Sequence, residues 1–182
     1  MFARLALSAT VALGCVLGCG ENGLGAPTQP TGTLLADVSP PRPWSESYQS
    51  SGTLAPGTRC PAPLLLESDA GDGTATHTGR YTIVNSHCLN PSTGELTDGS
   101  FLKTTANGDQ LSGTYFGQAT VVQSPDPIGT FAVNGSLTFT GGTGRFANAS
   151  GTVTMTGSQT ADFSRQPVVT ETALTMEGTI SY

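Results

Sequence analysis

The chain has 182 residues, a formal net charge of −6 and only 11% charged residues, with a single lysine, Lys103. A nucleic-acid-binding protein needs a clustered basic surface to displace counterions from phosphates, so this composition excludes that class of partner. Abundant glycine (24 residues) and threonine fit short strands joined by tight turns, and the sequence has no sustained helical period.

The first residues predict a cleaved export signal. An apolar run over 5–16 is too short to span a bilayer as a mature helix, and small residues follow it. The segment VLGC at 16–19 resembles the lipobox of bacterial lipoproteins, and this resemblance implies cleavage before Cys19 and attachment of lipid to its thiol. An ordinary signal peptide or an uncleaved anchor is the alternative, and ALGC at 12–15 is a weaker match. We expect an exported protein held by lipid in a bacterial membrane, which is the outer membrane if the cell is Gram-negative.

Residues 19–43, which begin with the lipidated cysteine, are rich in Gly, Pro and Thr. Such a segment cannot bury enough apolar surface to offset its ordering entropy, so we expect a flexible tether. The chain therefore divides into a signal peptide over 1–18, this tether, and a folded domain over 44–182.

From residue 44 onward, apolar side chains alternate with polar ones at period two. In the stretch 130–139, four apolar residues share one face, which predicts a strand with one buried side. Turn signals separate such runs, for example the Asn-Gly pair within 106–109 and the two prolines within 124–129. The predicted strands are 45–54, 63–69, 74–87, 97–105, 111–122, 130–140, 150–160 and 169–182.

Consecutive strands joined by short turns predict an antiparallel sheet, and closure into a barrel removes its exposed edges. The predicted fold class is therefore all-β, an up-and-down antiparallel barrel of about eight strands, preceded by the cleaved signal peptide and a disordered linker. The sequence DAGDG at 69–73 has a faint likeness to a calcium loop but lacks the ligand spacing, so we expect a turn there.

Two cysteines, Cys60 and Cys88, lie 28 positions apart in the predicted domain. In an exported protein such a pair predicts one disulfide, which stabilises the fold by on the order of 3 kcal/mol. A metal site built from His77, His87 and Cys88 is the alternative. Because neighbouring residues point to opposite faces of a strand, and because no CxxC or HxxxH spacing is present, we expect no metal and no cofactor.

The stretch GGTGRFA at 141–147 matches the GxGxxA turn of dinucleotide-binding proteins, and Asp162 follows Gly142 by 20 positions. A phosphate site of that kind needs a helix after the glycines, whereas alternating Gly, Thr and Val follow here. We therefore interpret the stretch as structural, with glycines that allow unusual backbone angles, a threonine that holds the turn and one inward-facing ring. The residues expected to form this barrel-closing loop are Gly141, Gly142, Thr143, Gly144, Phe146 and Gly151.

The same loop carries a family resemblance. GGTGRFANASG at 141–151 resembles the GGTG-F-G-A-G loop of the allene oxide cyclase and dirigent superfamily, whose members are eight-stranded barrels of the calycin type. The segments 73–82 and 96–115 are similar to a bacterial branch of these barrels. The resemblance covers residues 45–182 and implies that Phe146 closes one barrel end, and trimers are common among the plant relatives.

Plant members of that superfamily steer cyclisation or radical coupling mainly through the shape of an apolar pocket, and their polar catalytic residues have no match here. The ionisable residues considered instead are Glu67, Asp69, Arg80, Tyr81, Tyr115 and Glu171. Each is better explained as a solvated strand residue or a core aromatic, so the sequence assigns no catalytic residue.

Three functions remain open. The first is a membrane-anchored lipoprotein whose barrel binds a small apolar ligand in its mouth. The second is an isomerase or cyclase that resembles the plant enzymes, and the third is a structural or adhesive envelope protein. We expect a protein without enzymatic activity, and the lining of the barrel interior is the feature that separates the three.

Overall fold

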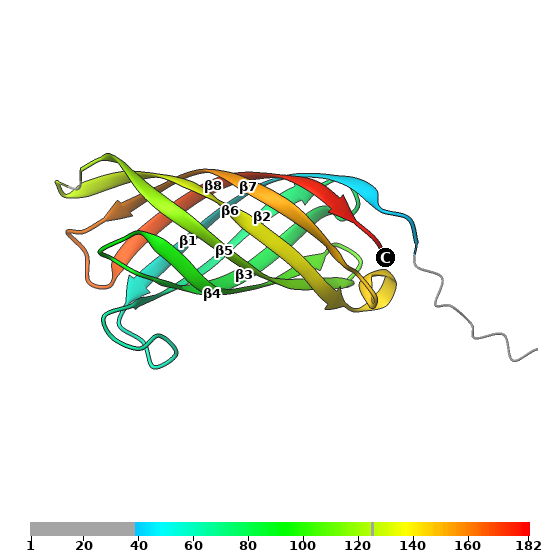
Figure 1. Cartoon of the computed structure of the whole chain (residues 1–182), viewed down its shortest axis with the longest axis horizontal. Coiled ribbons are helices and arrows are strands. Elements are labelled where there is room, and N and C mark those ends of the chain that lie inside the picture. Colours follow the sequence, from blue (N-terminus) through cyan, green and yellow to red (C-terminus); the bar gives the residue numbers. More distant parts are fainter. Residues whose placement is uncertain (1–38, 125) are drawn as a thin grey trace, which may run out of the picture. The chain divides into compact units, whose positions relative to one another are not determined.

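The structure, a computed structural model, describes residues 39–124 and 126–182, and the predicted signal peptide, Cys19 and most of the tether lie outside them. In the described chain each strand pairs with the next, and β8 also pairs with β1. The elements are β1 (Arg42–Ala55), β2 (Leu65–Ala75), β3 (Gly79–Leu89), β4 (Glu95–Thr105), β5 (Gln110–Gln123), β6 (Ile128–Gly142), the short 3-10 helix η1 (Gly144–Phe146), β7 (Gly151–Asp162) and β8 (Val168–Ile180). The sheet is thus a closed barrel (Figure 1).

The predicted fold class is confirmed as an all-β, up-and-down antiparallel barrel of eight strands. Along β1, buried Trp44, Glu46 and Tyr48 alternate with exposed Ser45 and Ser47. The same alternation in the other strands directs apolar side chains into the barrel and mostly Ser and Thr outward. The core therefore lies inside the barrel.

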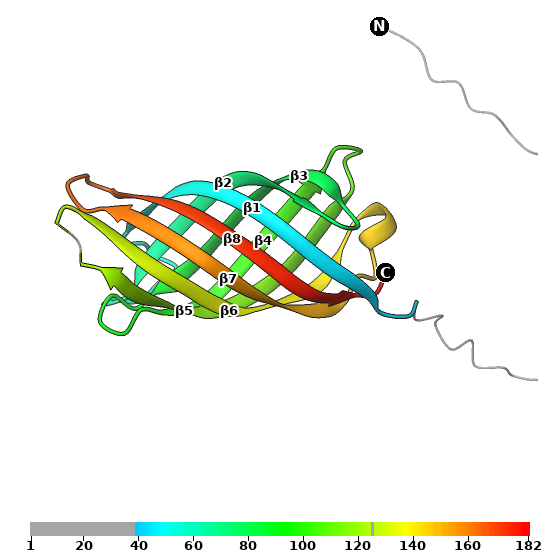
Figure 2. The same cartoon turned by 90° about the horizontal axis from the view of Figure 1, so that it is seen from above.

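The connections between strands lie alternately at the two ends of the barrel. One end, called the η1 end below, has the β2–β3 and β4–β5 turns and the β6–β7 connection that contains η1. The opposite end, called the mouth end, has the β1–β2, β3–β4, β5–β6 and β7–β8 connections. Arg42 at the start of β1 pairs with Ile180 at the end of β8. The described chain therefore enters and leaves the barrel at the η1 end, as Figure 2 shows.

The turn predicted at 69–73 and the start of the strand predicted over 74–87 are wrong, whereas most of that predicted strand is present as β3. β2 continues through this stretch to Ala75, and the hairpin turn follows it. Gly71 and Gly73 allow β2 to lie close to β1, since a Cβ at either position would overlap backbone atoms of β1. In the sequence, glycines of this kind look the same as glycines of a turn.

The β1–β2 loop at the mouth end is fastened to the outer wall of the barrel. The predicted disulfide between Cys60 and Cys88 is present and joins this loop to β3. Arg59 donates hydrogen bonds to the carbonyl oxygens of Ser86 on β3 and Asp98 on β4. Because disulfides persist in oxidising compartments, this bond indicates an extracytoplasmic protein.

The core near the η1 end contains a buried ion pair. Lys103 is fully buried, and its Nζ lies 2.6 Å from Oε1 of Glu46. The carboxylate also accepts hydrogen bonds from Trp44 Nε1, at 2.8 Å, and from the Tyr81 hydroxyl. The ammonium lies 5.1 Å from the ring centroids of Tyr81 and Phe101, which is cation–π range. Burial lowers the pKa of Lys103, and the Glu46 carboxylate opposes that shift.

The glycine-rich connection between β6 and β7 forms η1. Gly141 and Gly144 have φ angles of 135° and 56°, in the region that favours glycine, whereas a Cβ at Gly142 would overlap a backbone carbonyl of β5 instead. The Thr143 hydroxyl accepts a hydrogen bond of 3.0 Å from the backbone N–H of the first β5 residue. The loop is therefore tied to the start of β5.

Phe146 on η1 is fully buried, and its ring centroid lies 5.0 Å from that of Tyr182. Replacing Phe146 by alanine should lower the free energy of unfolding by roughly 3–5 kcal/mol, because removal of a buried ring leaves a cavity. Urea denaturation followed by the fluorescence of Trp44, the only tryptophan of the chain, measures the change.

Phe116→Ala is the matched control for this substitution. Phe116 lies on β5 and is 63% exposed, so its loss should change stability by less than about 0.5 kcal/mol. Equal effects of the two substitutions would contradict a barrel-closing role for Phe146.

Candidate functional site

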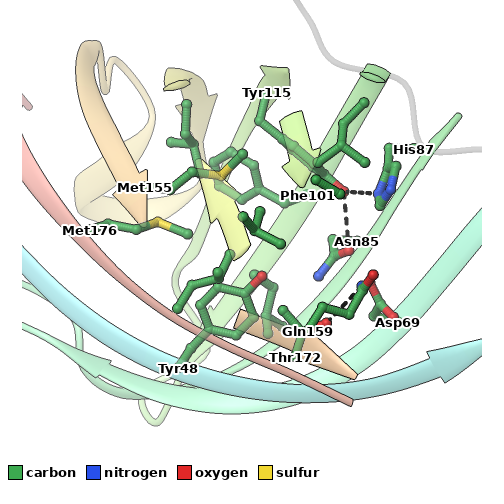
Figure 3. A pocket seen from close by; sticks show the side chains of 16 residues that line it. Tyr48, Asp69, Asn85, His87, Phe101, Tyr115, Met155, Gln159, Thr172 and Met176 are labelled. Carbon is green, nitrogen blue, oxygen red and sulfur yellow. Dashed lines mark hydrogen bonds between the residues drawn. The ribbon is translucent and has the colours of Figure 1, made fainter. Parts of the chain in front are cut away.

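The middle of the barrel contains a cavity of about 40 Å³. The polar residues that line it are Tyr48, Asp69, Asn85, His87, Tyr115, Gln159 and Thr172, and apolar residues complete the wall. Figure 3 shows Met155 and Met176 on one side, with the polar ends of Asn85, Asp69 and His87 on the other. The cavity is therefore two-sided, with an apolar and a polar wall.

A larger pocket, of about 290 Å³, lies at the mouth end and is called the mouth pocket below. Its apolar lining includes Leu54, Leu65, Leu89, Val121, Phe131 and Phe163. Ala119 and Gln159 line both this pocket and the cavity, so the two spaces adjoin.

Strand pairing sets the polar side chains side by side. Glu67 and Asp69 are buried on β2, and Asn85 and His87 are buried on β3. The register pairs Glu67 with His87 and Asp69 with Asn85. Because both strands alternate at period two, all four side chains face inward as two cross-strand pairs.

Hydrogen bonds extend this group to β5 and β7. The Tyr115 hydroxyl lies 3.0 Å from Nδ1 of His87 and donates to Oδ1 of Asn85 at 3.2 Å (Figure 3). On the other side of the imidazole, Nε2 lies 3.3 Å from Oε2 of Glu67. Gln159 Nε2 donates to Oε1 of Glu67 at 2.6 Å. The resulting polar cluster consists of Glu67, Asp69, Asn85, His87, Tyr115 and Gln159.

Several buried atoms of this cluster lack a hydrogen-bond partner. In the described part of the chain, the unpartnered buried side-chain atoms are Ser50 Oγ, Glu67 Oε2, Asn85 Nδ2 and His87 Nε2. The Glu67 and His87 atoms are close enough for an ion pair but do not have hydrogen-bond geometry. Such atoms are few in native proteins, and three of these four belong to one cluster beside a cavity. This concentration marks the cluster as the candidate site.

Burial, followed by repulsion from Glu67, raises the pKa of Asp69 from 3.8 to about 7, while His87 and a hydrogen bond from Thr170 oppose the shift. Burial also raises the pKa of Tyr48 and of Tyr115, so both hydroxyls keep their protons at neutral pH. Asp69 therefore changes its charge close to neutral pH.

The Asp69→Asn variant should gain stability relative to the wild type as the pH rises from about 4 to about 7. In this range the folded wild type holds a proton on Asp69 that the unfolded chain has released, so Asp69 makes stability fall by about 1.4 kcal/mol per pH unit. Urea denaturation of both proteins at several pH values measures the difference.

Asp72→Asn is the control, since Asp72 is exposed on the same strand. It should not reproduce the gain with pH. A stability difference between wild type and Asp69→Asn that stays constant from pH 4 to pH 7 would mean that Asp69 titrates normally in the folded protein.

The structure separates the ionisable residues considered from the sequence. Those in the polar cluster are Glu67, Asp69 and Tyr115. Tyr81 donates a hydrogen bond to Glu46 of the buried ion pair, whereas Arg80 and Glu171 are exposed on the outer wall.

Sequence reasoning missed Asn85 and Gln159, and it considered His87 only as a metal ligand. Their inward position follows from the same alternation that predicted the strands, but amides carry no motif. Within the described residues, no group of three or more His, Cys, Asp and Glu side chains is arranged to hold a metal ion.

No helix in the described part of the chain is long and apolar enough to cross a membrane. Comparison of the chain with protein-family models, with curated proteins and with solved structures found no match. The barrel interior is therefore the basis for a proposed function.

Proposed function

We propose that this exported protein binds one small, mainly apolar molecule through the mouth of its barrel. The observation that carries the proposal is that the two spaces adjoin: the mainly apolar mouth pocket shares Ala119 and Gln159 with the two-sided cavity. Ligand sites in proteins are typically apolar concavities with a few convergent polar groups, and their volumes begin near 300 Å³. The mouth pocket has about 290 Å³.

The likeness of the 141–151 loop to allene oxide cyclases and dirigent proteins supports this proposal, since pockets of that superfamily hold small apolar molecules. The polar cluster also favours a second candidate, an isomerase or cyclase. A carboxyl group with a pKa of about 7, as for Asp69, can give or take a proton at neutral pH. A purely structural role is less well supported, because it gives no reason for unpartnered polar atoms beside a cavity.

Ligand binding can be tested with the neutral fluorophore N-phenyl-1-naphthylamine. We expect a saturable rise in its fluorescence with the mature protein. Ala119→Leu should weaken the affinity by about tenfold, because Ala119 lines both spaces and a larger side chain there takes up room that the ligand needs.

Ala173→Leu is the matched control, since Ala173 is exposed on the outer face of β8. This variant should bind as the wild type does. Two results would count against a binding site at the mouth. One is a fluorescence rise that does not saturate, and the other is an affinity for the fluorophore that neither variant changes.

The same proposal includes a lipid anchor at Cys19, suggested by the lipobox resemblance and compatible with an exported protein that forms a disulfide. Cys19→Ala should shift the exported protein from the membrane fraction to the soluble fraction, because the thiol that carries the lipid is lost. Cys15→Ala, at the weaker match, should stay in the membrane fraction. Retention of the Cys19→Ala protein in membranes would refute the anchor.

A further inference from the structure

An unpartnered amide donor faces the cavity. Asn85 lines the cavity and is only 9% exposed, and its Nδ2 atom has no hydrogen-bond partner among the described residues. The other amide atom, Oδ1, accepts the hydrogen bond from Tyr115. Figure 3 shows Asn85 between Tyr115 and Asp69, with its nitrogen directed toward the cavity. Since a buried N–H group without an acceptor costs free energy, an acceptor placed in this cavity would be bound favourably.

The charges around the cavity decide which acceptor fits. Asp69 places a carboxyl group at its polar wall, and a second carboxyl group, of Glu67, lies 3.3 Å from the lining residue His87. No Lys or Arg of the described chain lines the cavity. An anionic acceptor would therefore be repelled as soon as these groups ionise. An ammonium group offers only donors, which would leave Nδ2 of Asn85 unsatisfied. A neutral oxygen meets both conditions.

We infer that the cavity receives a neutral oxygen of the ligand, as in a ketone carbonyl, with Nδ2 of Asn85 as its donor. The inference rests on the proposed function, because the apolar remainder of the ligand occupies the mouth pocket. The Tyr48 side chain lines the same cavity, and its hydroxyl is a second donor for the two lone pairs of a carbonyl oxygen.

The two volumes fit this division of the ligand. About 40 Å³ is room for one small polar group, and the adjoining mouth pocket, which Ala119 also lines, offers about 290 Å³ of mainly apolar space. Water is the competing occupant, because a cavity of this size also holds a water molecule that would satisfy Asn85. The experiment must therefore separate a ligand oxygen from water.

Three probes of equal chain length, octan-2-one, octanoate and octylamine, differ only in their polar group. Each is titrated into the mature protein that carries N-phenyl-1-naphthylamine, and the displacement of the fluorophore gives the affinity of the probe. We expect octan-2-one to bind at least about tenfold more tightly than either charged probe, because only its oxygen is both neutral and an acceptor.

A substitution at the donor gives the second measurement. Asn85→Leu should weaken the affinity for octan-2-one by about tenfold. It should change the affinity for the fluorophore by less than about twofold, since the fluorophore has no oxygen to accept the hydrogen bond. Asn134→Leu is the matched control, because Asn134 is exposed on the outer face of β6. It should leave both affinities unchanged.

The outcomes distinguish this inference from the proposed function. If the fluorophore does not bind to the wild type, the proposed function fails and the inference fails with it. If it binds, but octanoate or octylamine displaces it as well as octan-2-one does, the binding site stands and the inference is overturned. Unchanged ketone affinity in a folded Asn85→Leu protein also overturns it and assigns water as the partner of Asn85. If that variant does not fold, the three probes on the wild type decide alone.

Discussion

Closure of the sheet is the constraint on which the rest of the structure depends. Because β8 pairs with β1, the inward side chains of all strands share one narrow interior, and each buried charge must find its partner there. Near the η1 end this requirement is met, since Glu46 is paired with Lys103 and hydrogen-bonded by two aromatic side chains. The cost of desolvating the two charges offsets much of their attraction, so such a pair adds little net stability. Its main effect is to determine which side chains contact one another in the core.

Around the cavity the same requirement is only partly met. The His87 imidazole lies within ion-pair distance of Glu67 but not of the second carboxyl group, Asp69, and Asn85 keeps a donor without an acceptor. Natural proteins depart from full polar satisfaction mainly at functional or strained sites. The contrast within one core therefore separates residues that hold the barrel together from residues that the proposed ligand would contact.

The sequence predicted the barrel because alternation at period two is local and needs no knowledge of strand pairing. The polar cluster depends on pairing, and this is why only part of it could be foreseen: Gln159 and Glu67 meet although 92 positions separate them. Lys103 shows the same limit. It occupies an inward position two residues after Phe101, but a lysine is expected in solvent unless a buried carboxylate such as Glu46 is known to face it. Alternation at period two thus predicts which way a side chain points, whereas the pairing of strands in the closed sheet determines which residue it contacts.

The pairing of Arg42 with Ile180 has a practical meaning for the mouth pocket. Both ends of the barrel's chain emerge at the η1 end, and the pocket opens at the opposite end, some ten residues of strand away along each wall. A support, a reporter or a membrane joined to the chain before β1 or after β8 is therefore attached behind the pocket. The points of attachment and the opening of the pocket therefore lie at opposite ends of the barrel.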